Sequence, residues 1–193
     1  RRKDPDFPDI PLITGSILDA ALLKEAMRDV DRVIHLVGIL APSPGASFEQ
    51  VHVQGTRNVV EAARAAGVSR YIQMSALGTR PNAASQYHQS KWAAEEIVRA
   101  SGLPCTIFRP SVIFGPHDAF VNLFAAMARV SPILPVLGNG QAKMQPIRIE
   151  DVVTPFAQAL AMRSTIGATY AMGGGAALTF QKILETICAA LGK

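Results

Sequence analysis

Residues 70–110, which read RYIQMSALGTRPNAASQYHQSKWAAEEIVRASGLPCTIFRP, decide the fold class of this chain. An apolar run of strand length at 71–74 leads into a loop, then into a helix expected over about 85–100. A second apolar strand is expected at 105–109. Both strands are apolar throughout rather than alternating, which indicates that both of their faces are covered. A strand–helix–strand unit of this kind predicts parallel strands joined by a right-handed crossover.

The same alternation continues on both sides of this unit and predicts an α/β fold with a doubly wound, Rossmann-like parallel sheet. We expect residues 1–135 to form a nucleotide-binding domain, and residues 136–193 a small C-terminal substrate-side region interleaved with the sheet. The further elements expected are strands at 10–14, 32–37 and 170–172 and helices at 20–28, 48–66, 118–130, 151–162 and 179–191.

Composition limits the classes of function. Hydrophobic residues make up 49% of the chain and charged residues 18%, which predicts a sizeable buried core. The net charge of +4 is scattered except at residues 1–3, so we expect no nucleic-acid partner. No apolar run is long enough to span a bilayer. Cys105 and Cys188 lie in apolar runs, which is typical of buried free thiols in a reducing compartment, and we expect a cytoplasmic location.

The front of the chain lacks the glycine-rich turn that normally receives a pyrophosphate at a helix N-terminus. If residues 10–14 are the third strand of the sheet, the first two strands precede this sequence, and about 35–50 further residues would supply them. Residues 10–14 should then form no ladder with the strand at 32–37. The alternative is that residues 10–14 are a loop, or pair directly with that strand.

Tyr87 and Lys91 lie four residues apart, so they share one helical face. A phenol with a pKa of about 10 exchanges protons slowly at neutral pH, but a nearby ammonium favours the phenolate and lowers that pKa. We expect the pair to lie on an exposed helical face that opens onto the C-terminal edge of the sheet near Ser75. Because the spacing alone is common by chance, the alternative is an ordinary amphipathic face.

Four segments in this order give the chain a family resemblance: VHVQGTRNVVEAARAAGVSRYIQMSALG (51–78), SQYHQSKWAAEE (85–96), SGLPCTIFRPSVIFGPHDAF (101–120) and QPIRIEDVV (145–153). They resemble the extended, or atypical, short-chain dehydrogenases of the NAD-dependent epimerase/dehydratase family. Within that group they look like bacterial relatives of the NAD(P)H-binding accessory subunit of respiratory complex I. The resemblance implies NADP or NAD as cofactor, with a small-molecule substrate that the sequence leaves unknown.

The resemblance also implies catalytic roles. Tyr87 would be the acid/base, and Lys91 its partner and the anchor of the cofactor ribose. Ser75 resembles the hydroxyl that polarises a substrate carbonyl, or alternatively bonds to nearby backbone. Sugar epimerases carry their catalytic hydroxyl one place later, where this chain has Ala76. His52 stands where many relatives carry the Asn of an N-V-x-G-T motif, and we expect it to be a structural hydrogen-bonding residue.

Further cofactor contacts are implied along the edge of the sheet. Residues 36–38 would line the adenosine, residues 16 and 17 the adenine, and residues 110–112 the nicotinamide end, while a basic residue at position 2 would favour the 2′-phosphate of NADP. Each apolar member could equally be plain core. The implied cofactor-binding residues are Arg2, Ser16, Ile17, Leu36, Val37, Gly38, Ser75, Tyr87, Lys91, Pro110, Ser111 and Val112.

Two functions therefore stay open. The first is an oxidoreductase or epimerase/dehydratase that transfers a hydride to or from NAD(P), which the Tyr87–Lys91 pair favours. The second is a non-catalytic NAD(P)H-binding structural or assembly module, associated peripherally with a respiratory complex, which Ala76 and His52 favour. We expect no metal site, because the four histidines form no ligand cluster with cysteines or carboxylates.

Overall fold

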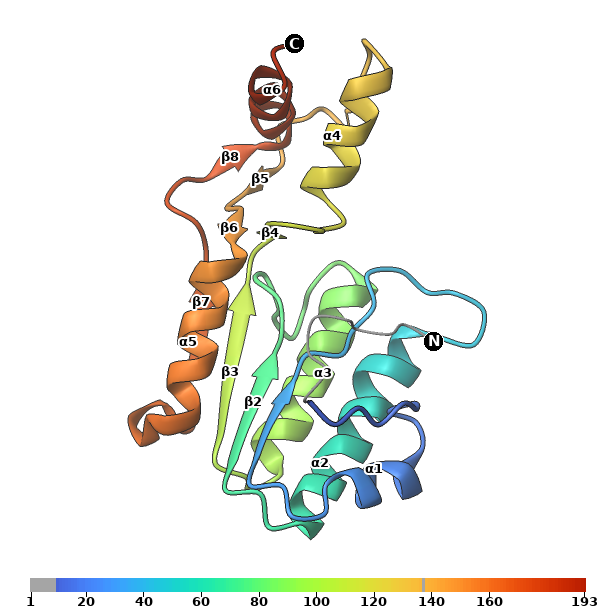
Figure 1. Cartoon of the computed structure of the whole chain (residues 1–193), viewed down its shortest axis with the longest axis vertical. Helices are drawn as coiled ribbons and strands as arrows, with labels where there is room; N and C mark the ends of the chain where they lie inside the picture. Colours follow the sequence, from blue (N-terminus) through green and yellow to red (C-terminus); the bar gives the residue numbers. More distant parts are fainter. Residues whose placement is uncertain (1–9, 137) are drawn as a thin grey trace.

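A computed structural model describes residues 10–136 and 138–193. Its main sheet has four parallel strands in the order β1 (Arg32–His35), β2 (Arg70–Met74), β3 (Cys105–Pro110) and β7 (Thr169–Met172). The strands run toward the same edge (Figure 1). The predicted α/β fold with a parallel sheet is confirmed.

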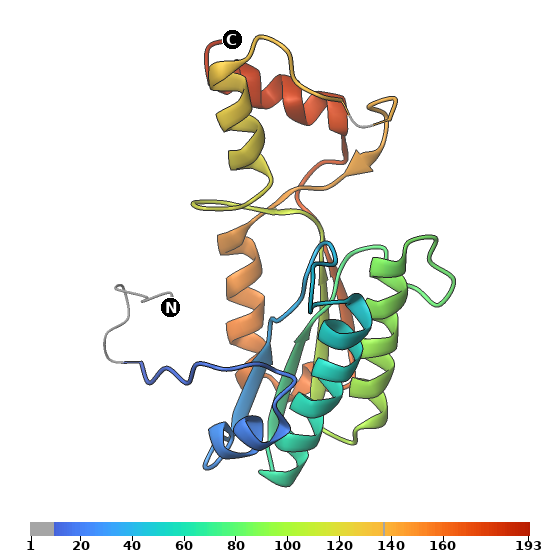
Figure 2. The ribbon, with the colours of Figure 1, turned by 90° about the vertical axis from the view of Figure 1, so that its right-hand side faces the viewer.

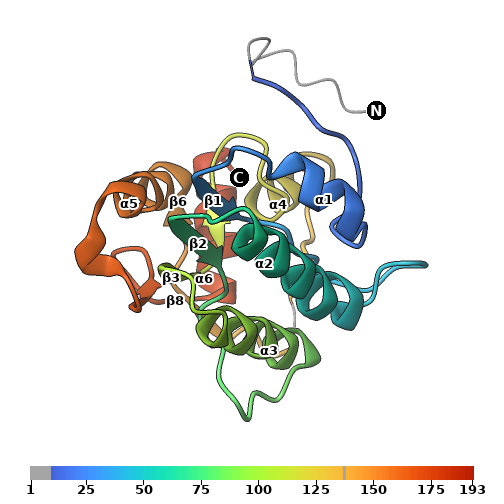
Figure 3. The same ribbon diagram turned by 90° about the horizontal axis from the view of Figure 1, so that it is seen from below.

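Helices cover both faces of this sheet (Figure 2). On one face lie α2 (Gly55–Ala65) and α3 (Gln86–Ala100), with α1 (Ala20–Ala26) packed against α2, and on the other face lies α5 (Ile149–Ala161). The view along the strands in Figure 3 shows the three layers edge-on.

Two apolar clusters hold these layers together. Between the sheet and the α2–α3 layer, Tyr71 and Ile107 pack against Val59, Ala63 and Val98. Between the sheet and α5, Ile72 and Phe108 pack against Val152 and Phe156. Tyr71 and Ile72 are neighbours that point to opposite faces, and both are completely buried. Apolar residues at consecutive strand positions are thus explained by two covered faces.

A second group of elements sits beyond the C-terminal edge of the sheet (Figure 1). In it, α4 (Val121–Val130) packs against α6 (Phe180–Ala190) around Phe124 and Phe180. The division of the chain at residue 135 stays a prediction, since the chain passes between the two groups more than once. The remaining short elements of the chain are β4 (Ile113–Phe114), which pairs with β6 (Ile147–Arg148), and β5 (Lys143–Met144), which pairs with β8 (Leu178–Thr179). A 3-10 turn, η2 (Arg163–Thr165), follows α5 at the N-terminal edge of the sheet.

The sequence prediction of a strand at residues 10–14 is wrong. This segment forms no strand, and its side chains at Ile10, Leu12 and Ile13 are exposed. It makes no ladder with β1, as expected, and among the described residues β1 pairs with β2 alone. A strand is defined by hydrogen bonds to a neighbour, so a β-rich sequence without one stays extended coil.

The helix expected at 48–66 is in fact two elements. A π-helical segment, η1 (Glu49–Gln54), runs directly into α2. The wider π turn is rare, and no local periodicity distinguishes it from an α-helix. Within the described part of the chain, none of the helices is both long and apolar enough to cross a membrane.

Candidate functional site

The predicted site residues meet at the C-terminal edge of the sheet, where short hydrogen bonds tie the strand ends together. Ser75 N donates to Phe108 O (2.7 Å), Leu77 N to Pro110 O (2.8 Å), and Ser111 N to Met172 O (2.8 Å). The segment after β1 reaches the same place, because a methyl group built on Gly38 would lie 3.7 Å from the Lys91 Nζ. The strand ends therefore hold Ser75 and residues 110–112 along one edge, where Lys91 lies next to Gly38 and to the Met74 carbonyl.

Lys91 is a buried cation, not the exposed group that sequence analysis predicted. Its residue is 4% exposed, and Nζ donates a hydrogen bond to Met74 O at 2.8 Å. Burial lowers the pKa of Lys91 to about 8, against the opposing attraction of the Glu95 carboxylate. Among the described residues this is the one hydrogen bond that Nζ makes, which leaves donor capacity beside Gly38.

Tyr87 lies one helical turn before Lys91 and is half-buried in a cluster of rings. It meets Phe48, His52 and His88 edge-on, with ring centroids 5.9, 5.6 and 5.0 Å away. Burial raises the pKa of Tyr87, opposite to the lowering that we predicted from the Lys91 ammonium. Desolvation of the phenolate is the cause, while the ammonium is hydrogen-bonded to the Met74 carbonyl.

Ser75 is buried on the α3 side of the sheet, where its hydroxyl lies 3.4 Å from the Thr79 hydroxyl. It also lies beside Glu95, a fully buried carboxylate that receives two hydrogen bonds from Arg109, at 2.8 and 2.6 Å. Burial favours a raised pKa for Glu95, but hydrogen bonds from Arg109, Ser75 and Arg99 outweigh it and lower the pKa. The Ser75 hydroxyl is thus engaged in a polar cluster inside the protein.

The ion pair of Glu95 with Arg109 was not predicted from the sequence. The spacing carried a signal, because Glu95 follows Lys91 by four residues and so continues its buried helical face. With Glu96 next to it, however, the sequence alone does not distinguish a buried Glu95 from a solvated one. Arg109 is the second-last residue of β3, and its partly buried charge needs a partner.

His52 makes structural hydrogen bonds, as predicted. Its residue is 1% exposed; Nε2 accepts from Ile39 N at 3.0 Å, and Nδ1 lies 2.8 Å from the Ser90 hydroxyl. A second buried histidine, His35, ends β1 and pairs with the Tyr71 hydroxyl at 2.9 Å. The Nε2 of His35 has no hydrogen-bond partner among the described residues. Burial first, and the Lys91 charge second, lower the pKa of both histidines to about 4.

The residues implied for the adenosine side lie farther along, near α1 and α2. Ile17 packs closely against the start of α2, where a methyl group on Gly55 would meet its side chain at 2.2 Å. Asn58 donates to Ile17 O, and the Ser16 hydroxyl accepts from Leu18 N. Leu36 and Val37 are about half-exposed at the open edge of β1. Arg2 lies outside the described residues.

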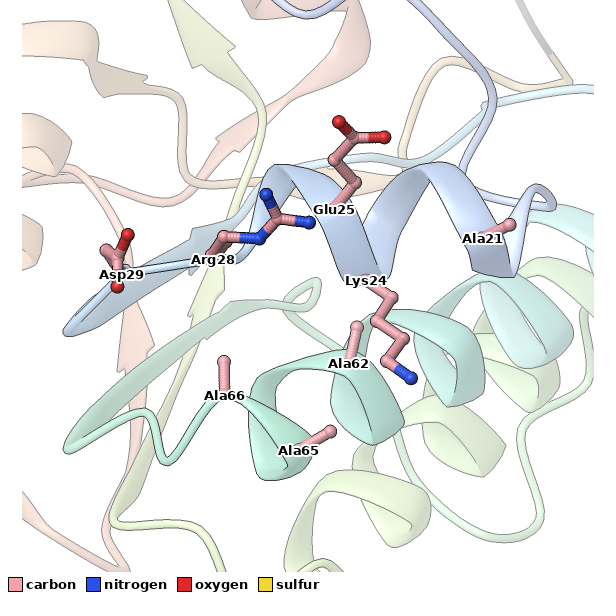
Figure 4. Close-up of a pocket in the computed structure, with 8 residues that line it drawn as sticks. All are labelled: Ala21, Lys24, Glu25, Arg28, Asp29, Ala62, Ala65 and Ala66. Carbon is pink, nitrogen blue, oxygen red and sulfur yellow. The ribbon is translucent and has the colours of Figure 1, made fainter.

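The hollow drawn in Figure 4, about 460 Å³, lies between α1 and α2 and includes none of the predicted site residues. A second hollow, about 390 Å³, lies beside the N-terminus of α3 and includes Phe48 and Ser90. In the described parts of the chain, no three His, Cys, Asp or Glu side chains gather as metal ligands would.

A parallel sheet covered on both faces, with a Tyr–Lys pair and a glycine at its C-terminal edge, defines the class of Rossmann-like short-chain dehydrogenases. The chain belongs to the NAD-dependent epimerase/dehydratase family, whose model matches residues 1–173.

The curated relatives of this chain include both a reductase and a subunit of a respiratory complex. Ceramide reductase of Caulobacter vibrioides is 35% identical over 78% of this chain and 48% of its own length. The mitochondrial NADH-ubiquinone oxidoreductase 40 kDa subunit of Neurospora crassa is 27% identical over 94% of this chain and 48% of its own length. This chain thus spans about half the length of these curated relatives.

Solved structures of the same fold include the dTDP-glucose 4,6-dehydratase DesIV of Streptomyces venezuelae, a double mutant with NAD bound. It matches with a TM-score of 0.86 and 28% identity, over 98% of this chain and 66% of that one. A dTDP-glucose 4,6-dehydratase of Bacillus anthracis with NAD matches with a TM-score of 0.82 and 24% identity, over 98% of this chain and 66% of that one. Structural neighbours of this chain therefore bind NAD.

Proposed function

We propose that this chain binds NADP or NAD at the C-terminal edge of the sheet and serves as an oxidoreductase or epimerase/dehydratase acting on a small molecule. The observation that carries the proposal is Lys91: a desolvated ammonium with donor capacity left, directly beside the backbone of Gly38. A buried cation is costly unless it is paired, and ribose hydroxyls would complete its hydrogen bonds.

The residues at this edge fit such a cofactor. Lys91 would donate to the ribose, Gly38 would allow close backbone approach, and residues 110–112 would border the nicotinamide end. When bound, the nicotinamide supplies or accepts the hydride. Tyr87, one turn from Lys91, would hold or take up the substrate proton on its phenolic oxygen. A nearby ribose and a cationic ring would counter the burial that now raises the pKa of Tyr87.

The test is cofactor binding by the natural full-length protein, measured by calorimetry. Lys91→Met should weaken binding of NAD(P)(H) by about tenfold or more, because a hydrogen bond to a charged group contributes roughly 1.5–3 kcal/mol. Lys24→Met on α1 is the matched control, since Lys24 is exposed and far from this edge. Equal affinities for both variants and the parent protein would contradict the proposal.

The same measurement separates the two cofactors. We propose that Arg2 favours NADP through its 2′-phosphate, so Arg2→Ala should weaken NADP(H) binding and leave NAD(H) binding nearly unchanged. Equal loss for both cofactors would rule out that role. The cytoplasmic location also stays a proposal.

The second candidate is a cofactor-binding module without turnover, attached peripherally to a respiratory complex. Two observations favour it: the Ser75 hydroxyl is engaged with the Glu95 cluster, and the relatives include complex I subunits. Tyr87→Phe, which keeps the ring, decides between them. In an enzyme it should abolish turnover of a carbonyl or sugar-nucleotide substrate and retain cofactor affinity. In a binding module the parent protein itself should turn over none of these substrates.

A further inference from the structure

His52 lies on an unusual piece of helix at the centre of the proposed site. In η1 the backbone bonds are of the i to i+5 type, as between Gly55 N and Gln50 O. Single π turns of this kind are rare and are frequently found at functional sites. Here the turn presents the His52 ring inward, stacked on Phe48 (5.4 Å between centroids) and edge-on to Tyr87.

The hydrogen bonds of His52 have a fixed direction. Ile39 N–H can only donate, so Nε2 of His52 is the acceptor and the ring proton lies on Nδ1. Nδ1–H then donates to the Ser90 hydroxyl, whose own proton goes to Tyr87 O at 2.7 Å. The chain of bonds runs from Ile39 through His52 and Ser90 to the backbone of Tyr87.

This series of hydrogen bonds connects the two halves of the site. Ile39 follows Gly38, which lies beside Lys91, and a methyl group on Gly38 would come within 3.3 Å of the His52 Nε2. At its other end, Ser90 and Tyr87 belong to the first turns of α3. We propose that His52 is a positioning residue that holds the Gly38–Ile39 loop and the Tyr87 turn in one arrangement. The backbone that would contact the cofactor and the acid/base Tyr87 are thereby positioned relative to each other. This inference rests on the proposed function.

The arrangement requires a neutral ring. A protonated His52 would have no lone pair for Ile39 N–H, and that part-buried donor would lose its partner. The groups facing the ring are Lys91 and Tyr87 from α3 and His35 from β1; Lys91 is the cation among them and opposes a second charge. The lowered pKa of His52, about 4, keeps the ring neutral at physiological pH.

The test uses three variants of the full-length protein. His52→Phe keeps the ring packing and removes both nitrogens; His52→Asn restores one acceptor and one donor. Ser90→Ala removes only the link to Tyr87. His52→Phe should weaken cofactor binding about tenfold, whereas Ser90→Ala should leave affinity within about twofold. His52→Asn should recover most of the loss. A folded His52→Phe protein with parental affinity, or no rescue by Asn, would overturn the proposal.

A measurement on the parent protein guards against variants that fail to fold. Nitrogen-15 NMR of the histidine side chains should show His52 as the neutral Nδ1–H form from pH 7 down to about pH 5. An Nε2–H form, or a ring that is charged at pH 6, would refute the proposed bond direction. If the parent protein binds cofactor and Lys91→Met weakens it, the proposed function stands whatever His52 does. If the parent does not bind, the proposed function itself fails.

Discussion

At the scale of single residues, a pair of buried neutral histidines makes the stability of the protein depend on pH. His35 and His52 are nearly inaccessible, and their pKa values fall to about 4 because burial and the Lys91 charge penalise the cationic form. In the unfolded chain each histidine titrates near 6.5. The folded pKa is the lower one, so the unfolded state binds protons first as the pH falls. The stabilising effect is complete above about pH 6.5 and is lost toward pH 4.

We therefore predict that the free energy of unfolding falls between pH 6.5 and 4, by up to about 3 kcal/mol for each histidine at roughly 1.4 kcal/mol per pKa unit. His52→Asn should lower the number of protons taken up on unfolding by one and so flatten the plot of unfolding free energy against pH. Urea denaturation at several pH values measures this slope. His117→Asn is the control, because His117 is exposed and its positive φ of 65° suits Asn. Identical slopes for both variants would contradict the prediction.

At the scale of elements, the sequence was informative where a local pattern sufficed. The strands around residues 71–74 and 105–109 and the helix between them were predicted closely, because apolar runs and glycine stops are local signals. The π turn was not predicted, and the strand predicted at residues 10–14 does not form. Both outcomes depend on hydrogen bonds that sequence periodicity does not report. For the site, spacing predicted Tyr87 and Lys91, whereas the burial of Lys91 and the ion pair of Glu95 with Arg109 arise only from packing.

Arg70 illustrates how packing joins elements that the sequence leaves separate. It is 4% exposed, and its guanidinium donates to Ala159 O in α5, to Pro104 O before β3, and to the hydroxyls of Thr106 and Thr165. One side chain at the start of β2 thus fastens the N-terminal edge of the sheet to the end of α5. Its direct register partner on β1 is Arg32, which is exposed.

We predict that Arg70→Met lowers the free energy of unfolding by about 3 kcal/mol, because several buried acceptors lose a charged donor. Arg32→Met, the same change at the paired position, should alter it by less than about 0.5 kcal/mol. Chemical denaturation of both variants measures the difference. Comparable losses at the two positions would show that the bonds of Arg70 do not stabilise the fold.

At the scale of the whole molecule, the chain has separate cores on either side of the C-terminal edge of the sheet. Below it lie the clusters around Tyr71 and Phe108, and above it the cluster around Phe124 and Phe180. Where residues 110–112 leave β3 toward the upper group, Ile147 N donates to Val112 O at 2.9 Å, and the Ile147 side chain packs in the cluster around Phe108. The proposed nicotinamide contacts therefore lie at the junction, where a substrate held by the upper group would meet the cofactor.

Separate cores predict that the two groups open independently. Phe180→Ala, at a side chain that is 2% exposed and 5.4 Å from the Phe124 ring, should cost about 3–5 kcal/mol locally and speed amide exchange in α4 and α6. Phe156→Ala, at a ring 4.5 Å from Phe108, is the matched change in the lower group and should speed exchange in β2 and β3 instead. Because Lys91 and Gly38 belong to the lower group, Phe180→Ala should retain cofactor affinity while Phe156→Ala reduces it. Hydrogen–deuterium exchange with calorimetry on the same samples measures both effects. If either substitution speeds exchange equally in both groups, the molecule opens as one unit and the upper group is not a separable substrate-side region.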